Sequence, residues 1–256
     1  MEVGNMISDE TKRKLRELGL DEMNDILKVQ DSDPALYTSM PFDERLNLAI
    51  DSLYQYKNNN RSKRLVKQAQ LRFTDADVNT IYYSQRGLDK NQIIELSTCQ
   101  YMRNNASLVL HGFTGSGKTF LACALGKAAC RQLYRVRYIR IPELLDLRDQ
   151  AVAEGRGISK LVTKFSNYHL LILDEWLMNQ LSDDDVRFIF ELTEKRYDCH
   201  STIFCTQYKI SDWHTRLGGG TLADAILDRI VHNSIRIETG SINMREHFSF
   251  NSSQDV

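Results

Sequence analysis

The run of residues from Gly112 to Thr119 constrains this chain more than any other feature of its sequence. It matches the phosphate-loop pattern G-x-x-x-x-G-K-[ST] at every fixed position. Glycines let the backbone turn sharply and bring N–H groups onto phosphate oxygens, and a helix beginning near Lys118 adds the positive end of its dipole. Lys118 can neutralise the β- and γ-phosphates, and the Thr119 hydroxyl can ligate Mg²⁺. We therefore predict a triphosphate site formed by Gly112, Phe113, Thr114, Gly115, Ser116, Gly117, Lys118, Thr119 and Phe120.

The residues around this loop alternate between strand-like and helix-like runs. Short apolar or β-branched segments are expected to form strands, and the longer segments between them are expected to form helices. The predicted strands span residues 107–111, 136–141, 169–173, 202–206 and 234–238, and the predicted helices span residues 118–131, 142–153, 159–166, 183–197 and 222–231. We therefore predict an α/β fold, a P-loop domain with a central parallel five-stranded sheet flanked by helices. This context disfavours the alternative of a glycine-rich turn without a ligand.

The apolar run from Leu170 to Leu173 ends in two acids, Asp174 and Glu175. An Asp at the tip of a central parallel strand can hold Mg²⁺ opposite Thr119, and the following Glu can polarise a water for attack on the γ-phosphate. Many strands end in acids, so this run alone is a weak indication of a site. It becomes a strong indication because it follows a matched phosphate loop. Adjacent Asp and Glu favour an ATPase with a catalytic glutamate over a kinase or a small GTPase.

Two further segments supply candidate catalytic residues. The strand 202–206 can insert between the loop strand and the acidic strand, which would bring Thr206 and Gln207 beside the γ-phosphate; ordinary strand-end polar residues are the alternative. Arg229 ends a predicted helix and can reach the γ-phosphate of a neighbouring subunit, as arginine fingers do. The alternative for Arg229 is an intramolecular pair with Asp228 or Asp224. The candidate catalytic residues are thus Lys118, Glu175, Arg229, Thr206 and Gln207.

The N-terminal part of the chain has a helical pattern. Apolar residues recur at three- and four-residue steps over residues 15–27, and Pro41 is typical of the first turn of a second helix. The polar run over residues 58–60 is predicted to break this helix, and a basic helix is predicted to start at Arg61. These features predict a small all-α N-terminal domain over residues 1–70, for DNA binding or self-assembly, and an ATPase domain over residues 71–256.

The composition excludes several classes of function. The formal net charge is −1, so any nucleic-acid contact must depend on a local patch. The N-terminus lacks the apolar core of a secretory signal, and the most apolar run, residues 170–173, is too short to cross a bilayer. The five cysteines have no C-x-x-C spacing, which disfavours a zinc site or a disulfide framework and favours buried thiols in a reducing cytosol. We therefore expect a cytoplasmic protein without a membrane partner.

Four runs of residues together resemble the IstB-like ATPases, helper proteins of bacterial transposition that are close to the DnaC helicase loaders within the AAA+ class. The runs are Arg86-Gly87-Leu88-Asp89-Lys90 and the segments 110–119, 170–176 and 222–232. Segments 42–46 and 61–65 also look like this family, so the resemblance covers nearly the whole chain. It implies an N-terminal helical module, an AAA+ domain without the usual helical lid, ATP-dependent self-assembly, DNA binding and a transposase partner.

The resemblance also bears on single residues. It favours Arg229 as the arginine finger, and it implies that Arg245 lies near the nucleotide or a subunit interface. Two departures weaken parts of the comparison. Gln207 stands where the family pattern has Asn, which affects its role beside the γ-phosphate. Residues 54–57 lack the Glu that often precedes the basic stretch, which affects the details of the N-terminal module.

The stretch from Lys57 to Arg72 contains six basic residues and no acid. Such a stripe can neutralise DNA phosphates by counterion release without reading the base sequence. On charge alone, a solvated helix face is the favoured alternative. The family resemblance favours DNA contact, and the candidate DNA-binding residues are Arg61, Lys63, Arg64 and Lys67.

The resulting hypothesis is an enzyme that binds ATP and Mg²⁺ and hydrolyses ATP to ADP and phosphate. As a transposition helper or regulator it would oligomerise on double-stranded DNA and recruit or stimulate a transposase, in the bacterial cytoplasm and at the nucleoid when bound to DNA. Two alternatives remain. One is a DnaC-like loader of the replicative helicase that acts on single-stranded DNA. The other is an assembly factor that binds nucleotide without turnover.

Overall fold

The computed structural model describes residues 8–240 and 242–244 of the 256-residue chain. Arg245, the expected late arginine of the nucleotide site, lies outside the described residues. The chain divides into two compact units, the first ending at Arg61 and the second beginning at Ser62. This division falls inside a helix, nine residues before the boundary expected from the sequence at residue 70.

The smaller unit is entirely helical. It contains α1 (Asp9–Glu17), α2 (Asp21–Ser32), α3 (Pro34–Tyr37) and the first part of α4 (Phe42–Ala69). The single amphipathic helix expected over residues 15–27 is two helices, because Gly19 has a left-handed φ of +67° that ends α1. Polar contacts join the helices: the buried Gln30 side-chain amide donates to the Arg45 carbonyl at 2.9 Å, and Lys57 pairs with Glu22 at 3.5 Å.

Helix α4 is continuous through the run Asn58-Asn59-Asn60, so the predicted break there is wrong. Asparagine disfavours a helix by less than about 0.7 kcal/mol per residue, whereas the residues that stop helices are glycine and proline. No glycine or proline occurs between Phe42 and Ala69. Beyond the run, Leu65 and Ala69 are buried in the core of the larger unit. The packing of these two residues outweighs the weak local preference of the three asparagines.

The larger unit is built on a parallel sheet of five strands in the order β2-β3-β4-β1-β5. The strands are β1 (Ser107–His111), β2 (Val136–Arg140), β3 (Leu170–Asp174), β4 (Ser201–Thr206) and β5 (Ser234–Glu238). The predicted insertion of β4 between the loop strand and the acidic strand is confirmed: Ile203 pairs with Leu108 on one side and with Ile172 on the other. All five strands therefore end at the same edge of the sheet.

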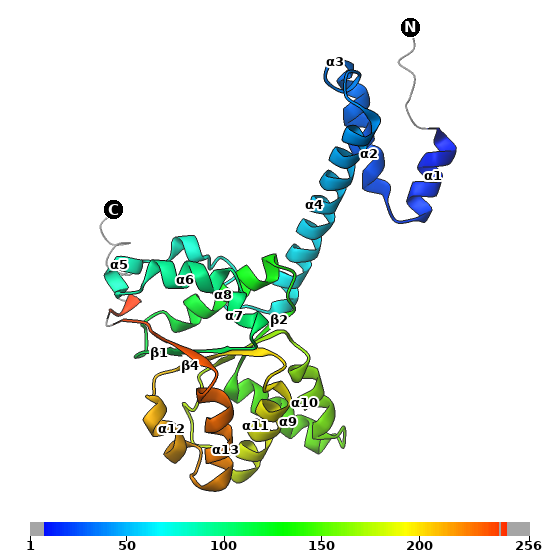
Figure 1. The fold of residues 1–256 in the computed structure, drawn as a ribbon. Coiled ribbons are helices and arrows are strands. Elements are labelled where there is room, and N and C mark those ends of the chain that lie inside the picture. Colours follow the sequence, from blue (N-terminus) through cyan, green and yellow to red (C-terminus); the bar gives the residue numbers. More distant parts are fainter. Residues whose placement is uncertain (1–7, 241, 245–256) are drawn as a thin grey trace, which may run out of the picture. The chain divides into compact units, whose positions relative to one another are not determined.

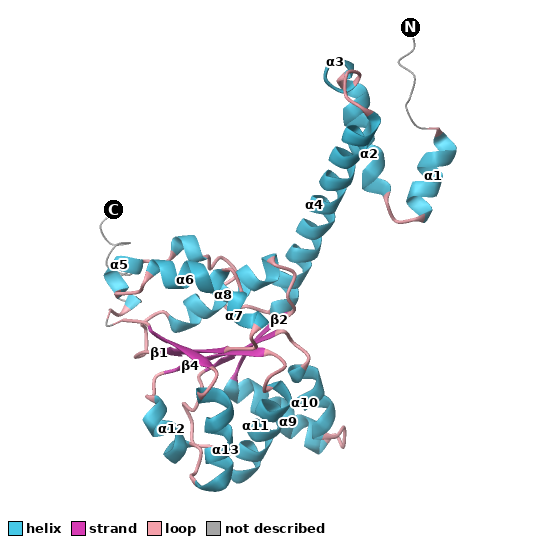
Figure 2. Ribbon diagram, viewed as in Figure 1, coloured by secondary structure: helices cyan, strands magenta, loops and turns pink. Residues whose placement is uncertain are grey.

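Helices cover both faces of this sheet (Figures 1 and 2). The first face carries α5 (Tyr83–Arg86), α6 (Lys90–Ser97), α7 (Gln100–Arg103) and α8 (Lys118–Arg131), with the short 3₁₀ turn η1 (Val78–Thr80) packed against α8. The second face carries α9 (Ile141–Ala153), α10 (Ile158–Ser166), α11 (Asp183–Arg196), α12 (Ile210–Arg216) and α13 (Gly220–Val231). The architecture is the predicted α/β fold, a central parallel five-stranded sheet flanked by helices on both faces.

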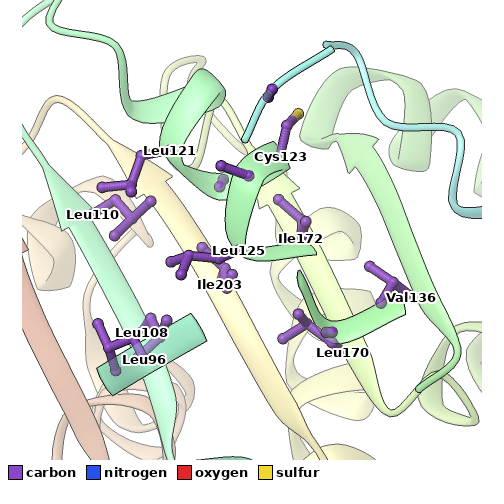
Figure 3. Close-up of a cluster of buried hydrophobic side chains, with 14 of the residues drawn as sticks. Leu96, Leu108, Leu110, Leu121, Cys123, Leu125, Val136, Leu170, Ile172 and Ile203 are labelled. Atoms are coloured by element: carbon purple, nitrogen blue, oxygen red, sulfur yellow. The ribbon is translucent and has the colours of Figure 1, made fainter. Parts of the chain in front are cut away.

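The two faces of the sheet form separate apolar cores because strand residues alternate between them. Leu108 and Leu110 of β1 pack under α8, whereas Val109 between them faces the α9–α13 layer. Figure 3 shows the first core, where Leu121 and Leu125 of α8 lie over the strands. Both faces of the sheet are covered, which matches the nearly continuous apolar runs of β1, β3 and β4.

The described residues that follow β5, 239–240 and 242–244, do not form a helical domain. Instead they return to the phosphate loop: the Met244 amide donates to the Gly115 carbonyl at 2.9 Å, and the Thr239 hydroxyl lies 2.6 Å from that of Ser116. This described part therefore contains no helical lid, as the family resemblance implied. None of the described helices is both long and apolar enough to cross a membrane.

Candidate functional site

The segment 112–117 connects β1 to α8 and turns back on itself. Gly117 caps α8 in the left-handed conformation, with a φ of +84°. A Cβ atom at this position would lie 2.9 Å from the guanidinium Nη2 of Arg86, so only glycine fits both the backbone and the space. The N–H groups in the first turn of a helix lack partners within the helix, so α8 presents donors and its positive end to the site. The loop thus has the form of an anion cradle.

Lys118 lies over this loop. Its ammonium group donates to the carbonyls of Gly112 and Phe113, each at 2.7 Å. These contacts hold the cation at the mouth of the cradle, where it can meet the distal phosphates of a nucleotide.

Asp174 lies at the end of β3, opposite the first turn of α8. Its Oδ2 accepts hydrogen bonds from the Thr119 hydroxyl at 2.9 Å and the Tyr138 hydroxyl at 2.8 Å, and its Oδ1 accepts from the Glu175 amide at 2.9 Å. Asp174 is 4% exposed. Burial, followed by the nearby Asp174 charge, raises the pKa of Tyr138, so its phenol stays protonated and remains a hydrogen-bond donor.

Glu175 begins a tightly turned segment. Its φ is +58° and that of Leu177 is +57°, both in the left-handed region that disfavours non-glycine residues. Arg216 of α12 holds this turn by donating to the carbonyls of Leu177 at 2.6 Å and Met178 at 3.0 Å. The Glu175 carboxylate lies 3.5 Å from the Arg140 guanidinium, which also pairs with Glu143.

Some of these groups line one cavity of about 330 Å³, at the low end of the range of about 300–1,000 Å³ for ligand pockets. The phosphate loop, Asp174, Glu175, Thr206 and Gln207 all contribute to its wall. The sequence analysis brought these residues together correctly, although their roles stay predictions. It missed other lining residues, among them Arg72, Phe73, Tyr82, Arg86 and Met244.

Thr206 and Gln207 differ in their surroundings. The Thr206 hydroxyl is buried, donates to the Trp176 carbonyl at 3.1 Å and accepts from the Tyr208 amide at 3.1 Å. It therefore braces the turn that follows Glu175. The Gln207 side-chain oxygen accepts from the Thr114 hydroxyl at 2.9 Å, so Gln207 is in direct contact with the phosphate loop.

Arg229 lies far from the phosphate loop of its own chain. It stands at the end of α13, just before β5 begins, whereas the loop follows the end of β1, and β1 and β5 run parallel in register. Five strand residues correspond to about 16 Å, which separates Arg229 from the loop edge. Arg229 pairs with Glu194, donates to the Ala225 carbonyl and lies over the Phe190 ring, rather than pairing with Asp228 or Asp224.

The basic residues fall into two groups. The candidate DNA-binding residues Arg61, Lys63, Arg64 and Lys67 are all exposed on α4, and no carboxylate within the described ranges pairs with them. By contrast, two other arginines have acidic partners: Arg131 pairs with Asp77 at 2.8 Å, and Arg140 pairs with Glu143.

Four of the five cysteines are buried, and Cys199 is exposed. Burial raises the pKa of Cys99 and Cys123 to about 11 and that of Cys130 to about 12, so these thiols stay protonated at neutral pH. No group of three or more potential metal ligands occurs among the residues that the structure describes. The buried cysteines therefore act as small apolar side chains in the core.

Solved structures share this fold. The DnaC helicase loader superposes with a TM-score of 0.55 at 22% identity, covering 64% of this chain and 96% of that one. AMPPCP-bound DnaA from Aquifex aeolicus superposes with a TM-score of 0.55 at 17% identity, covering 71% of this chain and 55% of that one. At these identities the likeness concerns the fold alone.

Sequence relatives are more similar and cover the chain more fully. The insertion sequence ATP-binding protein y4uH of Sinorhizobium fredii is 32% identical over 244 residues, 94% of this chain and 96% of the relative. The insertion sequence IS1162 ATP-binding protein of Pseudomonas fluorescens is 34% identical over 204 residues, 79% of this chain and 87% of the relative. The family described as IstB-like ATP binding protein matches residues 13–252. This chain belongs to the IstB-like ATP-binding proteins of insertion sequences.

Proposed function

We propose that this protein hydrolyses ATP to ADP and phosphate at the cavity between the phosphate loop and the end of β3. The observation that carries the proposal is the 2.9 Å hydrogen bond between Thr119 and Asp174, which joins the two halves of the site. Lys118 neutralises charge on the distal phosphates, and Glu175 is the base that polarises the attacking water. The membership in a family of ATP-binding proteins supports the identity of the nucleotide.

The residues present fit a magnesium ion. Thr119 and Asp174 offer a hydroxyl and a carboxylate oxygen side by side, and hard oxygen donors are the ligands that Mg²⁺ prefers. When bound, the ion neutralises charge on the phosphate oxygens. Tyr138 would hold the Asp174 carboxylate in place, and the Thr119 hydroxyl oxygen would be one ligand of the ion.

Hydrolysis is completed by a second copy of the chain. Arg229 is about one strand length from its own loop, so its guanidinium is available only to a nucleotide of a neighbouring subunit. In the single chain, Glu194 and the Phe190 ring hold it in a pre-set position at the surface. ATP-dependent assembly therefore precedes rapid turnover in this proposal.

The biological role that we propose is that of a transposition helper that assembles on duplex DNA and recruits or stimulates a transposase. The names of the relatives connect the family with insertion sequences. Four exposed residues of α4, Arg61, Lys63, Arg64 and Lys67, support contact with the DNA backbone, because no described carboxylate pairs with them. The fold of a helicase loader is shared, but a fold does not specify its substrate.

Two measurements test this function. Phosphate release is measured for the wild type and for Glu175→Gln in the presence of duplex DNA; the variant is expected to bind ATP and to release phosphate at least about 10²-fold more slowly. Gel shifts then compare binding to duplex and to single-stranded DNA. Replacing Arg61, Lys63, Arg64 and Lys67 by glutamine should reduce the slope of log affinity for duplex DNA against log salt concentration by up to about 4. A preference for single strands would favour the helicase loader, and undiminished hydrolysis by Glu175→Gln would contradict the assigned base.

A further inference from the structure

Arg86 is a buried arginine beside the phosphate loop, and the mechanism above gives it no role. It is the last residue of α5 and is 3% exposed. Its Nη2 donates to the Ser116 carbonyl at 2.7 Å, and the guanidinium lies against the backbone of Gly117. Arg86 also lines the cavity that contains Lys118 and Asp174.

The hydrogen bonds of Arg86 differ from those of an arginine with a purely structural role. Arg196, at the opposite edge of the sheet, is also 3% exposed, but five oxygens surround it. These acceptors are the carbonyls of Phe165, Ser166, Tyr168 and Ser201 and the hydroxyl of Thr202. Arg86 has one such acceptor, and its buried Nε has no partner. Its hydrogen-bonding capacity is thus largely unused.

The charge of Arg86 is also unbalanced. No carboxylate within residues 8–240 or 242–244 pairs with it. Burial lowers the pKa of Arg86 to about 10, so the guanidinium keeps its charge at neutral pH. A buried charge without a counter-ion is costly, and such groups in proteins are paired or face a ligand of opposite charge. In this site, the ligand of opposite charge is a polyphosphate.

We propose that Arg86 is a positioning residue of the nucleotide site, a second cation that attracts the phosphates from behind the loop while Lys118 acts from the front. This proposal rests on the proposed ATP site. The guanidinium contacts the backbone of the loop that would hold the phosphates. Only this backbone separates its positive charge from the phosphates, so the charge attracts them electrostatically. It therefore favours nucleotides in proportion to their charge, and it helps the site to prefer ATP over ADP.

Few other ionisable groups lie around Arg86 on this side of the loop. The loop segment 112–117 contains no titratable side chain, and neither do residues 239–240 and 242–244, which contact the loop and Arg86 from the other side. Tyr83, on the same helix, is the ionisable neighbour, and burial raises its pKa above the ordinary value of 10.0. Tyr83 therefore stays neutral over the range in which nucleotide binding is measured.

The first test removes the charge. Dissociation constants of ATP, ADP and adenosine are measured for the wild type and for Arg86→Gln. Loss of a unit charge near the phosphates at an effective dielectric constant of about 20 corresponds to a roughly tenfold to hundredfold weaker affinity for ATP. The loss for ADP should be smaller, and adenosine should change by less than about twofold because it carries no phosphate. An equal loss for all three ligands would show that Arg86 only shapes the loop.

The second test keeps a charge that can be titrated. A lysine buried at this position has a lowered pKa, because desolvation disfavours the ammonium form. ATP stabilises that form, so Arg86→Lys should bind ATP with nearly wild-type affinity at low pH and progressively more weakly as the pH rises through the lysine's pKa, within about pH 7 to 9.5. The ATP affinity of the wild type should not show this additional decline over the same pH range.

Arg196→Lys is the matched control, because it introduces a buried lysine away from the cavity. Its ATP affinity should follow the pH profile of the wild type. If Arg86→Lys follows that profile too, the proposal is overturned, and this result also decides the matter if Arg86→Gln fails to fold. The proposed ATP site itself fails in a different way, namely when the wild type takes up no ATP.

Discussion

Replacing Tyr138 by phenylalanine tests how the Asp174 carboxylate is held. The change removes one hydroxyl that donates to Asp174 at 2.8 Å and leaves the ring in place. The buried carboxylate keeps its bonds from Thr119 and the Glu175 amide. A hydrogen bond to a charged group contributes about 1.5–3 kcal/mol, so Tyr138→Phe should lower the free energy of unfolding by that amount. For a unit of this size, the melting temperature should fall by roughly 3–12 °C.

The structure offers a matched control for this prediction. Tyr101 is also buried, at 6% exposure, but its hydroxyl has no hydrogen-bond partner. Tyr101→Phe removes an unsatisfied polar group, so it should leave stability unchanged or raise it by up to about 1 kcal/mol. Thermal unfolding without nucleotide can be followed by tryptophan fluorescence, because both tryptophans of the chain, Trp176 and Trp213, are buried in the larger unit. Equal effects of the two substitutions would refute the reasoning.

Three further predictions concern charged groups. Lys118→Ala should weaken ATP binding by about 10³-fold, because a charge pair at about 4 Å and an effective dielectric constant of 20 contributes about 4 kcal/mol; fluorescence of a labelled ATP analogue measures it. Arg229→Ala should preserve ATP binding and lower the rate of phosphate release by the assembly by about 10³-fold. Glu194→Gln, which removes only the pairing partner of Arg229, should retain most of the rate of phosphate release. Burial lowers the pKa of His200, so on acidification this histidine is protonated in the unfolded chain before it is protonated in the folded chain. The free energy of unfolding should therefore fall as the pH drops below about 6.5, and urea denaturation of His200→Gln should show a smaller fall over that range.

The core of the fold could be predicted from the sequence because its determinants are local. The strands β1 and β5 and the helix α8 have the predicted bounds: β1 contains a continuous apolar run, β5 alternates isoleucine with polar residues, and α8 starts directly after the phosphate loop. The insertion of β4 between β3 and β1 followed from the P-loop pattern rather than from any residue of β4 itself. The convergence of Thr119 and Asp174 then follows, because parallel strands end at one edge of the sheet.

The rest of the site depends on contacts between distant segments. Tyr138 points to Asp174 from the neighbouring strand β2, and its residue type alone does not indicate that direction. Arg86 and Arg216 likewise reach the loop and the turn after Glu175 from short helices that the sequence analysis did not predict. The partner of Arg229 is Glu194, 35 residues away, where the sequence suggested only near neighbours.

The account's central claim is that the loop at 112–119 and the acid at the end of β3 bind one Mg²⁺–ATP together. Calorimetric titration of ATP into the wild type and Asp174→Asn, each with and without Mg²⁺, tests it most directly. We predict that the wild type binds one ATP per chain, that Mg²⁺ tightens this binding, and that Asp174→Asn loses most of the Mg²⁺ effect. An absence of ATP binding by the wild type, or an undiminished Mg²⁺ effect in Asp174→Asn, would contradict the claim.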